Sequence, residues 1–211
     1  EGIYLKYSEI EKVKKVSQIF HPIIREVLKE QKFKKPQIEI TTLTDVPAGT
    51  GLGSSGSFTT SLIKALCSFQ NKEIETKDLA EQACNIEINK LNKPIGIQDQ
   101  IAATYGGLNY IEFSTDYKDD YNITSIKDSF THKAINENLL LVWTGVHRKA
   151  DAILADQEKN LSQNKSNLIK LAKTTQDFYN NSKKKFDIFE LGSLLNEAWE
   201  IKKKFAKQIQ Y

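Results

Sequence analysis

The chain has 211 residues, of which 39% are hydrophobic and 27% charged, so it can bury a sizeable core, which argues against intrinsic disorder. Its 30 basic and 27 acidic residues give a formal net charge of +3, which leaves no basic excess for nucleic acid or a membrane surface. Two cysteines without a CxxC spacing, and no apolar run of bilayer length, predict a cytoplasmic protein with reduced thiols.

The first elements along the chain are predicted to be a helix, a strand and a glycine-rich loop. Apolar residues spaced by three and four predict an amphipathic helix over 8–31. Alternation in QIEITT predicts a short, half-buried strand over 37–42. The stretch DVPAGTGLGSSGSF follows at 45–58, and the periodic apolar residues after it predict a helix whose first turn contains 54–57.

The rest of the chain is predicted to mix strands and helices. A helix is expected from Thr76 as N-cap to about residue 91, followed by a short helix that begins at 98–100 and ends at Gly106 and Gly107. Further predictions, in chain order, are a strand over 108–113, a buried strand over 139–143, and helices over 149–160, 165–180 and 187–208. Because strands and helices do not alternate strictly, the pattern favours an α+β fold over a doubly wound parallel sheet.

The glycine-rich loop predicts an anion site at a helix N-terminus. Residues 51–56 satisfy GxGxxG, but residues 43–50 separate them from the preceding strand, which a dinucleotide-binding turn does not allow. No lysine stands where a Walker A loop needs one, and the loop runs into a helix instead of a second strand, unlike a protein-kinase loop. What remains is a loop whose backbone N–H groups and helix dipole favour a phosphate, with a plain surface loop as the alternative.

Two segments at a characteristic distance resemble the GHMP kinases, the family of galactokinase, homoserine kinase and mevalonate kinase. The segment 47–56, PAGTGLGSSG, resembles the PxxxGLGSS signature of that family. The segment 94–100, PIGIQDQ, resembles the part of its sugar kinases that carries the catalytic aspartate, and Glu87 precedes it where the family places a Mg²⁺-binding glutamate. HPIIR at 21–25, YGGLN at 105–109 and matches near Trp143 and Trp199 are most similar to the D-glycero-D-manno-heptose 7-phosphate kinases.

The resemblance implies a two-domain GHMP-kinase-like architecture, of which this sequence is expected to be a central portion. Residues 1–145 would form an N-terminal ATP-binding domain that lacks its first strands, and residues 146–211 the start of a helical C-terminal domain. The implied reaction is the ATP- and Mg²⁺-dependent phosphorylation of the anomeric hydroxyl of heptose 7-phosphate, for surface-glycan synthesis. A fucokinase-like or galactokinase-like enzyme and a non-catalytic nucleotide or sugar binder are the alternatives. Partners would be ATP and a sugar phosphate, with a monomer or a homodimer left open.

The resemblance also assigns roles to individual residues. Asp99 would accept or orient the proton of the sugar hydroxyl, with an ordinary helix-cap aspartate as the alternative. Ser55 and Glu87 would hold Mg²⁺, which prefers oxygen ligands, although periodicity alone favours an exposed helix acid for Glu87. Gly107 and Arg148 would contact the substrate, and a surface arginine is the alternative for Arg148. The residues assigned to the nucleotide phosphates are Pro47, Gly49, Gly51, Leu52, Gly53, Ser54 and Ser55.

Overall fold

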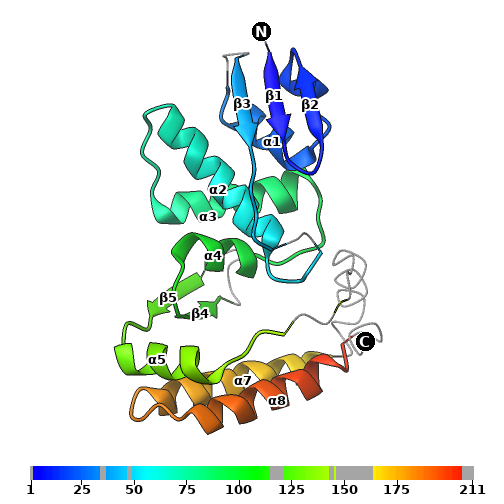
Figure 1. Ribbon diagram of the computed structural model, residues 1–211. Helices are drawn as coiled ribbons and strands as arrows, with labels where there is room; N and C mark the ends of the chain where they lie inside the picture. Colours follow the sequence, from blue (N-terminus) through cyan, green and yellow to red (C-terminus); the bar gives the residue numbers. More distant parts are fainter. Residues whose placement is uncertain are drawn as a thin grey trace. The chain divides into compact units, whose positions relative to one another are not determined.

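The computed structural model describes residues 2–33, 37–46, 49–114, 121–142, 145 and 164–205. The chain divides into two compact units, Glu1–Gly106 and Gly107–Tyr211, and each is considered by itself (Figure 1). Both units contain strands and helices without strict alternation, which confirms the predicted α+β class. The domain boundary expected after residue 145 stays a prediction.

The first unit contains a three-stranded sheet in the order β2-β1-β3. β1 (Ile3–Lys6) pairs antiparallel with β2 (Ile10–Val13). It pairs in parallel with β3 (Ile38–Thr41), so that Ile3 lies opposite Ile38. β3 confirms the strand that alternation predicted over 37–42.

The helix predicted over 8–31 is wrong in its first half. Residues 10–13 form β2, a 3₁₀ turn follows at Val16–Gln18, and only Pro22–Glu30 form a helix, α1. The spacing of apolar residues fits a helix throughout, but the backbone of 10–13 instead pairs with β1, a partner that local periodicity cannot reveal. α1 starts with a proline at its first position, and His21 caps it through Nδ1, which accepts the N–H of Ile24 at 3.3 Å.

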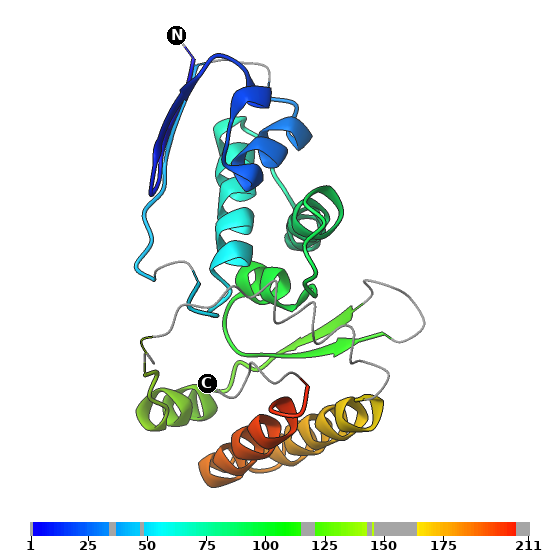
Figure 2. The same ribbon diagram turned by 90° about the vertical axis from the view of Figure 1, so that its right-hand side faces the viewer.

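Helices cover one face of this sheet and enclose the core. Figure 2 shows the sheet edge-on, with α1 and α2 (Ser54–Phe69) on the same side of it. The start of α2 confirms the helix predicted from 54–57. The core is built from apolar side chains of β1, these helices and α3 (Thr76–Cys84), together with one residue after the 3₁₀ turn and one beyond the end of α3. Its members are Ile3, Leu5, Ile19, Ile23, Ile24, Val27, Leu28, Leu62, Ile63, Leu66, Cys67, Leu79, Ala83 and Ile86. Packing on this core fixes the position of α2 and so of its N-terminal turn.

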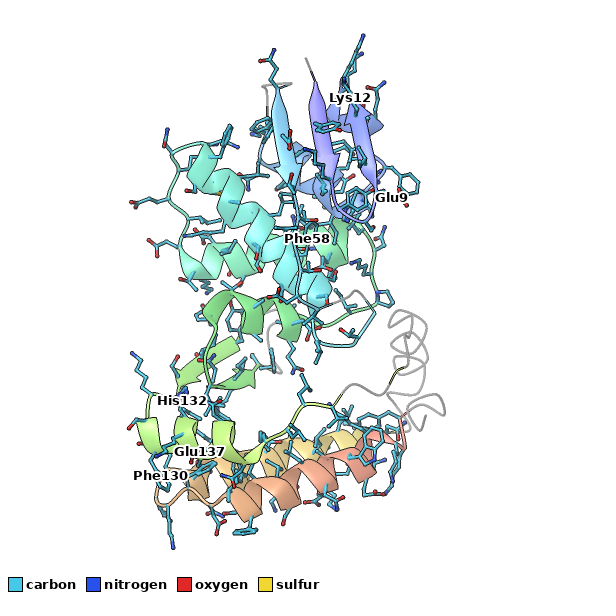
Figure 3. The ribbon with its side chains drawn as sticks, in the orientation of Figure 1. Glu9, Lys12, Phe58, Phe130, His132 and Glu137 are labelled. Carbon is cyan, nitrogen blue, oxygen red and sulfur yellow. The ribbon has the colours of Figure 1, made fainter. Side chains whose placement is uncertain are left out.

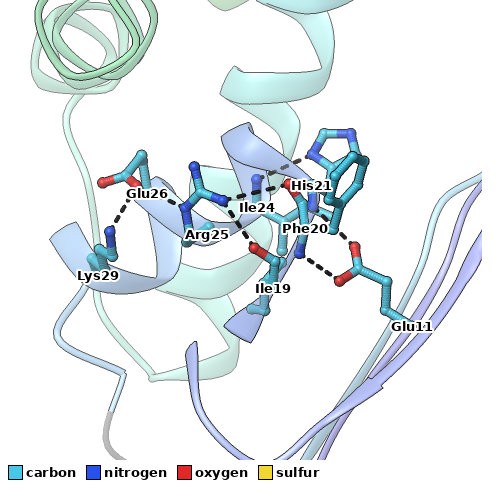
Figure 4. A network of polar contacts seen from close by, with 8 residues as sticks. All are labelled: Glu11, Ile19, Phe20, His21, Ile24, Arg25, Glu26 and Lys29. Carbon is cyan, nitrogen blue, oxygen red and sulfur yellow. Dashed lines mark hydrogen bonds and ion pairs between the residues drawn. The ribbon is translucent and has the colours of Figure 1, made fainter. Parts of the chain in front are cut away.

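The carboxylate of Glu11 joins β2 to the start of α1 (Figure 4). It accepts hydrogen bonds from the backbone N–H groups of Phe20 at 2.6 Å and His21 at 3.0 Å, and from the Tyr7 hydroxyl at 2.9 Å. Burial alone would raise the pKa of Glu11, but these hydrogen bonds outweigh it and hold the pKa below its ordinary value. Burial and the same carboxylate raise the pKa of Tyr7 to about 12. Glu11 is therefore an ionised anchor between the sheet and α1.

Glu11→Ala is expected to lower the free energy of unfolding at pH 7 by about 1.5–3 kcal/mol, the range for hydrogen bonds to charged groups. Because the folded pKa lies below the unfolded value, this stabilisation is complete above pH about 4.5 and is lost as the pH falls through the folded pKa. Urea titrations at pH 7 and pH 3.5 measure both effects. Lys12→Ala, an exposed change on the same strand (Figure 3), is the control, with an expected change within about 0.5 kcal/mol. An equal loss in the two variants would contradict the anchor.

α3 continues into a π-helical turn and then a short helix. The turn spans Asn85–Lys90, and together with α3 it confirms the helix predicted over 76–91, although Glu75 and not Thr76 is the N-cap. A π-helical turn widens the helix by one residue, a distortion that is frequent at functional sites. α4 (Gln98–Tyr105) confirms the predicted short helix and ends at Gly106.

The second unit pairs a two-stranded antiparallel sheet with helices. β4 (Asn109–Phe113) confirms the strand predicted over 108–113, whereas β5 (Tyr121–Ser125) and α5 (Ser129–Asn138) were not predicted. α7 (Lys165–Ser182) and α8 (Ile188–Lys202) confirm the last two predicted helices, with α8 ending earlier than expected. The rings of Tyr110 on β4 and Tyr179 on α7 stack with their centroids 3.7 Å apart, which ties the sheet to the helices.

The buried strand predicted over 139–143 is wrong where the structure describes it. Residues 139–142 adopt no strand, and Leu140 and Leu141 are 87% and 77% exposed. The apolar run therefore lacks a pairing partner among the described strands, and hydrophobicity alone misled the prediction. The helix predicted over 149–160 lies outside the described residues. In the described ranges, no helix is both long and apolar enough to span a bilayer.

Candidate functional site

The glycine loop enters α2 through three glycines in the left-handed region. Gly49, Gly51 and Gly53 have φ values of 80°, 75° and 69°, which residues with a side chain rarely adopt. Gly53 is also the N-cap of α2, and no side chain caps the helix there. The first-turn N–H groups of a helix have no intrahelical acceptor, and they lie at the positive end of its dipole. Ser54 and Ser55, both assigned to phosphates from the sequence, lie in this turn.

Glu87 lies at the centre of a group of hydrogen-bond donors next to Ser55. Its side chain is 0% exposed, in contrast to the exposed helix acid that periodicity alone predicts. The Ser55 hydroxyl and the Lys93 ammonium donate to Oε2, the latter at 2.7 Å. Oε1 lies 3.1 Å from Thr59 Oγ1 and accepts from Gln100 Nε2 at 3.0 Å.

Hydrogen-bond donors from α2, α4 and the segment between the π-helical turn and α4 keep Glu87 ionised. Burial raises the pKa of this carboxyl, but hydrogen bonds from Lys93, Ser55 and Gln100 outweigh the burial and hold the pKa below its ordinary value. A buried carboxylate is stable only when it is paired and hydrogen-bonded in this way. At neutral pH the structure thus places a negative charge beside the hydroxyl of Ser55 and the N-terminus of α2.

Asp99 lies against the glycine loop, in the first turn of α4. A Cβ added to Gly53 would be 3.5 Å from Asp99 Cγ and 3.6 Å from its Oδ2. Asp99 is exposed, and within the described part of the chain no hydrogen bond holds its carboxylate. Its neighbour Gln100 is buried and faces Glu87, so the first turn of α4 presents one residue to the loop and the next to the buried carboxylate.

Gly56 allows α2 and α4 to approach each other at this point. A Cβ on Gly56 would lie 3.1 Å from the carbonyl carbon of Asp99 and 3.1 Å from the backbone N of Gln100. Gly56→Ala should gain about 1 kcal/mol of helix propensity, but crowding against backbone costs about 1–3 kcal/mol. We expect a net loss of up to about 2 kcal/mol in the free energy of unfolding.

The matched control for Gly56 is Gly192→Ala in α8. Gly192 is also helical and has no atom within 4 Å of an added Cβ, so the same substitution should stabilise the chain by about 0.5–1 kcal/mol. Urea titrations of both variants test the sign of each change. Stabilisation by Gly56→Ala would show that the two helices are not in close contact at Asp99.

Three members of this site were not predicted from the sequence. Thr59 follows Ser55 by four residues, so helical spacing could have placed it on the same face. Gln100 lies within the quoted PIGIQDQ segment, but nothing in the sequence pointed its side chain at Glu87. Lys93 precedes that segment in a stretch that is neither helix nor strand, so no periodicity predicts the direction of its side chain.

The other predicted residues are placed as follows. Leu52 is half-exposed and, with Ser54 and Phe58, lines a pocket of about 500 Å³ between the end of β3 and α2. Phe58 projects from α2 (Figure 3). Gly107 follows the end of α4 and begins the second unit. Pro47 and Arg148 lie outside the described residues. The structure therefore brings together Gly53, Ser55, Glu87 and Asp99, all within the first unit.

Comparison with known proteins finds relatives among sugar and mevalonate kinases. Residues 15–107 match the family described as GHMP kinases N terminal domain. The chain is 30% identical over 187 residues to a D-glycero-alpha-D-manno-heptose 7-phosphate kinase of Campylobacter jejuni, a match that covers 88% of this chain and 55% of that protein. It is 26% identical over 167 residues to an L-fucokinase/L-fucose-1-P guanylyltransferase of Bacteroides fragilis, covering 77% of this chain and 18% of that protein. The chain thus spans about half the length of the first relative and less of the second.

Solved structures share the fold. The crystal structure of a D-glycero-D-manno-heptose 1-phosphate kinase from Bacteroides thetaiotaomicron superposes with a TM-score of 0.75 at 21% identity, covering 96% of this chain and 63% of that one. A mevalonate kinase superposes with a TM-score of 0.61 at 18% identity, covering 96% of this chain and 66% of that one. At these identities the likeness establishes the fold alone.

Proposed function

We propose that the chain is part of an ATP-dependent sugar kinase, because residues 15–107 match the GHMP kinases N terminal domain. We assign heptose 7-phosphate as the substrate and its anomeric hydroxyl as the acceptor, giving the 1,7-bisphosphate. The 30% identity to the Campylobacter jejuni protein named for heptose 7-phosphate supports this assignment. We place the reaction in the cytoplasm, where ATP is available.

The observation that carries the proposal is the position of Asp99 beside Gly53. A phosphate held at the N-terminus of α2 would lie next to this exposed carboxylate. In the proposed reaction the sugar hydroxyl oxygen attacks the γ-phosphorus, the bond to the leaving ADP oxygen breaks, and Asp99 accepts the hydroxyl proton. Left-handed glycines let the loop backbone approach the phosphates closely, because they have no Cβ. The pocket beside Leu52 and Phe58 has room for the nucleoside.

Ser55 and Glu87 fit the ligand demands of Mg²⁺. Both contribute oxygen atoms, their side chains are adjacent, and the carboxylate is ionised. One carboxylate and one hydroxyl suffice when phosphates and water supply the other ligands. When bound, the ion would neutralise charge on the transferred phosphoryl group. The role of the chain is to hold the two oxygens at the N-terminus of α2.

A fucokinase-like enzyme is the second candidate, supported by the 26% identity to the Bacteroides fragilis protein. ADP release with heptose 7-phosphate, fucose, galactose and mannose separates the two, and ³¹P NMR of the product identifies the hydroxyl that is phosphorylated. We expect turnover with heptose 7-phosphate to exceed that with fucose. The reverse order would favour the fucokinase. ATP binding without turnover on any sugar would contradict the kinase and indicate a non-catalytic binder.

A further inference from the structure

The ammonium of Lys93 lies between the two oxygens that we assign to Mg²⁺. Its Nζ is 2.7 Å from Ser55 Oγ and 2.7 Å from Glu87 Oε2. Ligands of Mg²⁺ lie at about 2.0–2.1 Å, so an ammonium bonded to both oxygens fills the space that a metal ion would need there. Two cations so close would also repel each other strongly.

We propose that Lys93 is a resident cation that closes the metal site in the nucleotide-free protein and must leave Glu87 before a divalent ion binds. This inference rests on the proposed function, since it takes Ser55 and Glu87 as the metal ligands. The inference goes beyond that function by regulating the metal site. Lys93 would keep free metal ions out and so link metal binding to nucleotide binding.

The hydrogen bonds around Glu87 leave one side of the carboxylate for a cation. Oε1 is engaged by Gln100, which is fully buried, and by Thr59, also fully buried. Only Oε2 faces Ser55 and Lys93. A divalent ion that binds this carboxylate together with Ser55 therefore competes with the ammonium for one oxygen.

The position of Lys93 allows its ammonium either to remain paired with Glu87 or to move away from it. Its backbone N–H donates to the carbonyl oxygen of Glu87 at 3.1 Å, which holds the root of the side chain beside the carboxylate. The side chain is 22% exposed and belongs to a segment that is neither helix nor strand, so the ammonium can move outward without unfolding a helix. A buried carboxylate left alone would be costly, which explains why a cation must be present at all times.

Phosphates of a bound nucleotide would favour the exchange. The ammonium has three donors and, after leaving Oε2, can bond to phosphate oxygens at the nearby N-terminus of α2. The same phosphates complete the ligands of the divalent ion. Without phosphates, the ammonium that leaves Glu87 finds no new anion and the divalent ion lacks phosphate ligands. We therefore expect weak binding of free metal ions.

Binding of Mn²⁺ in the absence of nucleotide, followed by electron paramagnetic resonance, tests the inference. Lys93→Met removes the charge but keeps an unbranched side chain, and should tighten Mn²⁺ binding about tenfold or more. Lys90→Met makes the same charge change on the preceding turn, where the lysine pairs at 3.7 Å with Glu30, and should leave Mn²⁺ affinity unchanged. Equal Mn²⁺ affinity in wild type and Lys93→Met would overturn the inference, as would no binding of Mn²⁺ by any variant.

A second measurement uses the wild-type protein, because Lys93→Met leaves Glu87 unpaired and could prevent folding. Acetylation of lysines by acetic anhydride, read by mass spectrometry, reports how accessible the Lys93 ammonium is. Saturating Mn²⁺ should increase the labelling of Lys93 relative to Lys90, and unchanged labelling would contradict displacement. The ADP-release assay judges the kinase proposal separately, so a kinase without displacement, and displacement without kinase activity, are distinct outcomes.

Discussion

Asp99→Asn is expected to lower kcat of the proposed kinase by about 10²–10⁴-fold, the usual contribution of a group that accepts a proton in the transition state. The amide has nearly the same shape but cannot accept that proton. Because Asp99 is exposed and no described residue hydrogen-bonds to its carboxylate, the change removes no internal contact. Stability should therefore stay within about 0.5 kcal/mol of wild type, and ATP affinity should change little.

Steady-state ADP release, isothermal titration with ATP and urea unfolding together test this expectation. Asp78→Asn is the matched control, since Asp78 is likewise an exposed acid in the first turn of a helix, α3, but is not part of the loop site. Its kcat should equal that of wild type. Undiminished turnover in Asp99→Asn would show that Asp99 does not accept the proton, whatever the substrate proves to be.

The parts of the fold predictable from sequence were those with a local cause. The start of α2 follows from glycines and serines before a periodic apolar run, and α4 follows from the break at Gly96 and the stop at Gly106. β2 and the run 139–142 failed because their states depend on pairing. Ile10 and Val13 pair with β1, whereas Leu140, in a more apolar segment, pairs with no described strand. Only residues 7–9 separate β1 from β2, but the spacing of apolar residues within a segment does not show whether its backbone pairs with another strand.

The sequence named part of the candidate site but not the side chains that surround Glu87. The resemblance named Ser55, Glu87 and Asp99, and the structure brings them to the end of α2. It did not predict that Glu87 is fully buried. Glu87 lies in a π-helical turn, which the spacing of apolar residues in an ordinary α-helix does not reveal. Nor did it predict Lys93 as the ion-pair partner, since its side chain reaches Glu87 from a segment that is neither helix nor strand.

Glu87→Gln is expected to lower the free energy of unfolding at pH 7 by about 3 kcal/mol. Breaking a buried ion pair costs about 3–5 kcal/mol, and the lower end applies because Lys93 is 22% exposed. The isosteric amide does not rescue the site. Lys93 can only donate hydrogen bonds and keeps its positive charge, so the neutral amide leaves this ammonium without a counter-charge whichever way the amide turns.

The pH dependence distinguishes this cause from a general loss of packing. Hydrogen bonds hold the pKa of Glu87 below its ordinary value in the folded state despite burial, so the stabilisation is complete above pH about 4.5 and is lost as the pH falls through the folded pKa. The difference between wild type and Glu87→Gln should therefore shrink as urea titrations move from pH 7 towards pH 3. A packing defect would give a difference that does not change with pH.

An exposed ion pair provides the control for Glu87→Gln. Lys77 and Glu81 lie 3.8 Å apart on the surface of α3, and Glu81→Gln should cost less than about 1 kcal/mol, as is usual for exposed pairs. Equal losses in Glu81→Gln and Glu87→Gln would mean that burial of Glu87 contributes nothing. A large loss confined to Glu87→Gln would instead show that the carboxylate proposed to hold Mg²⁺ also stabilises the first unit, through the donors of α2, α4 and Lys93 that converge on it.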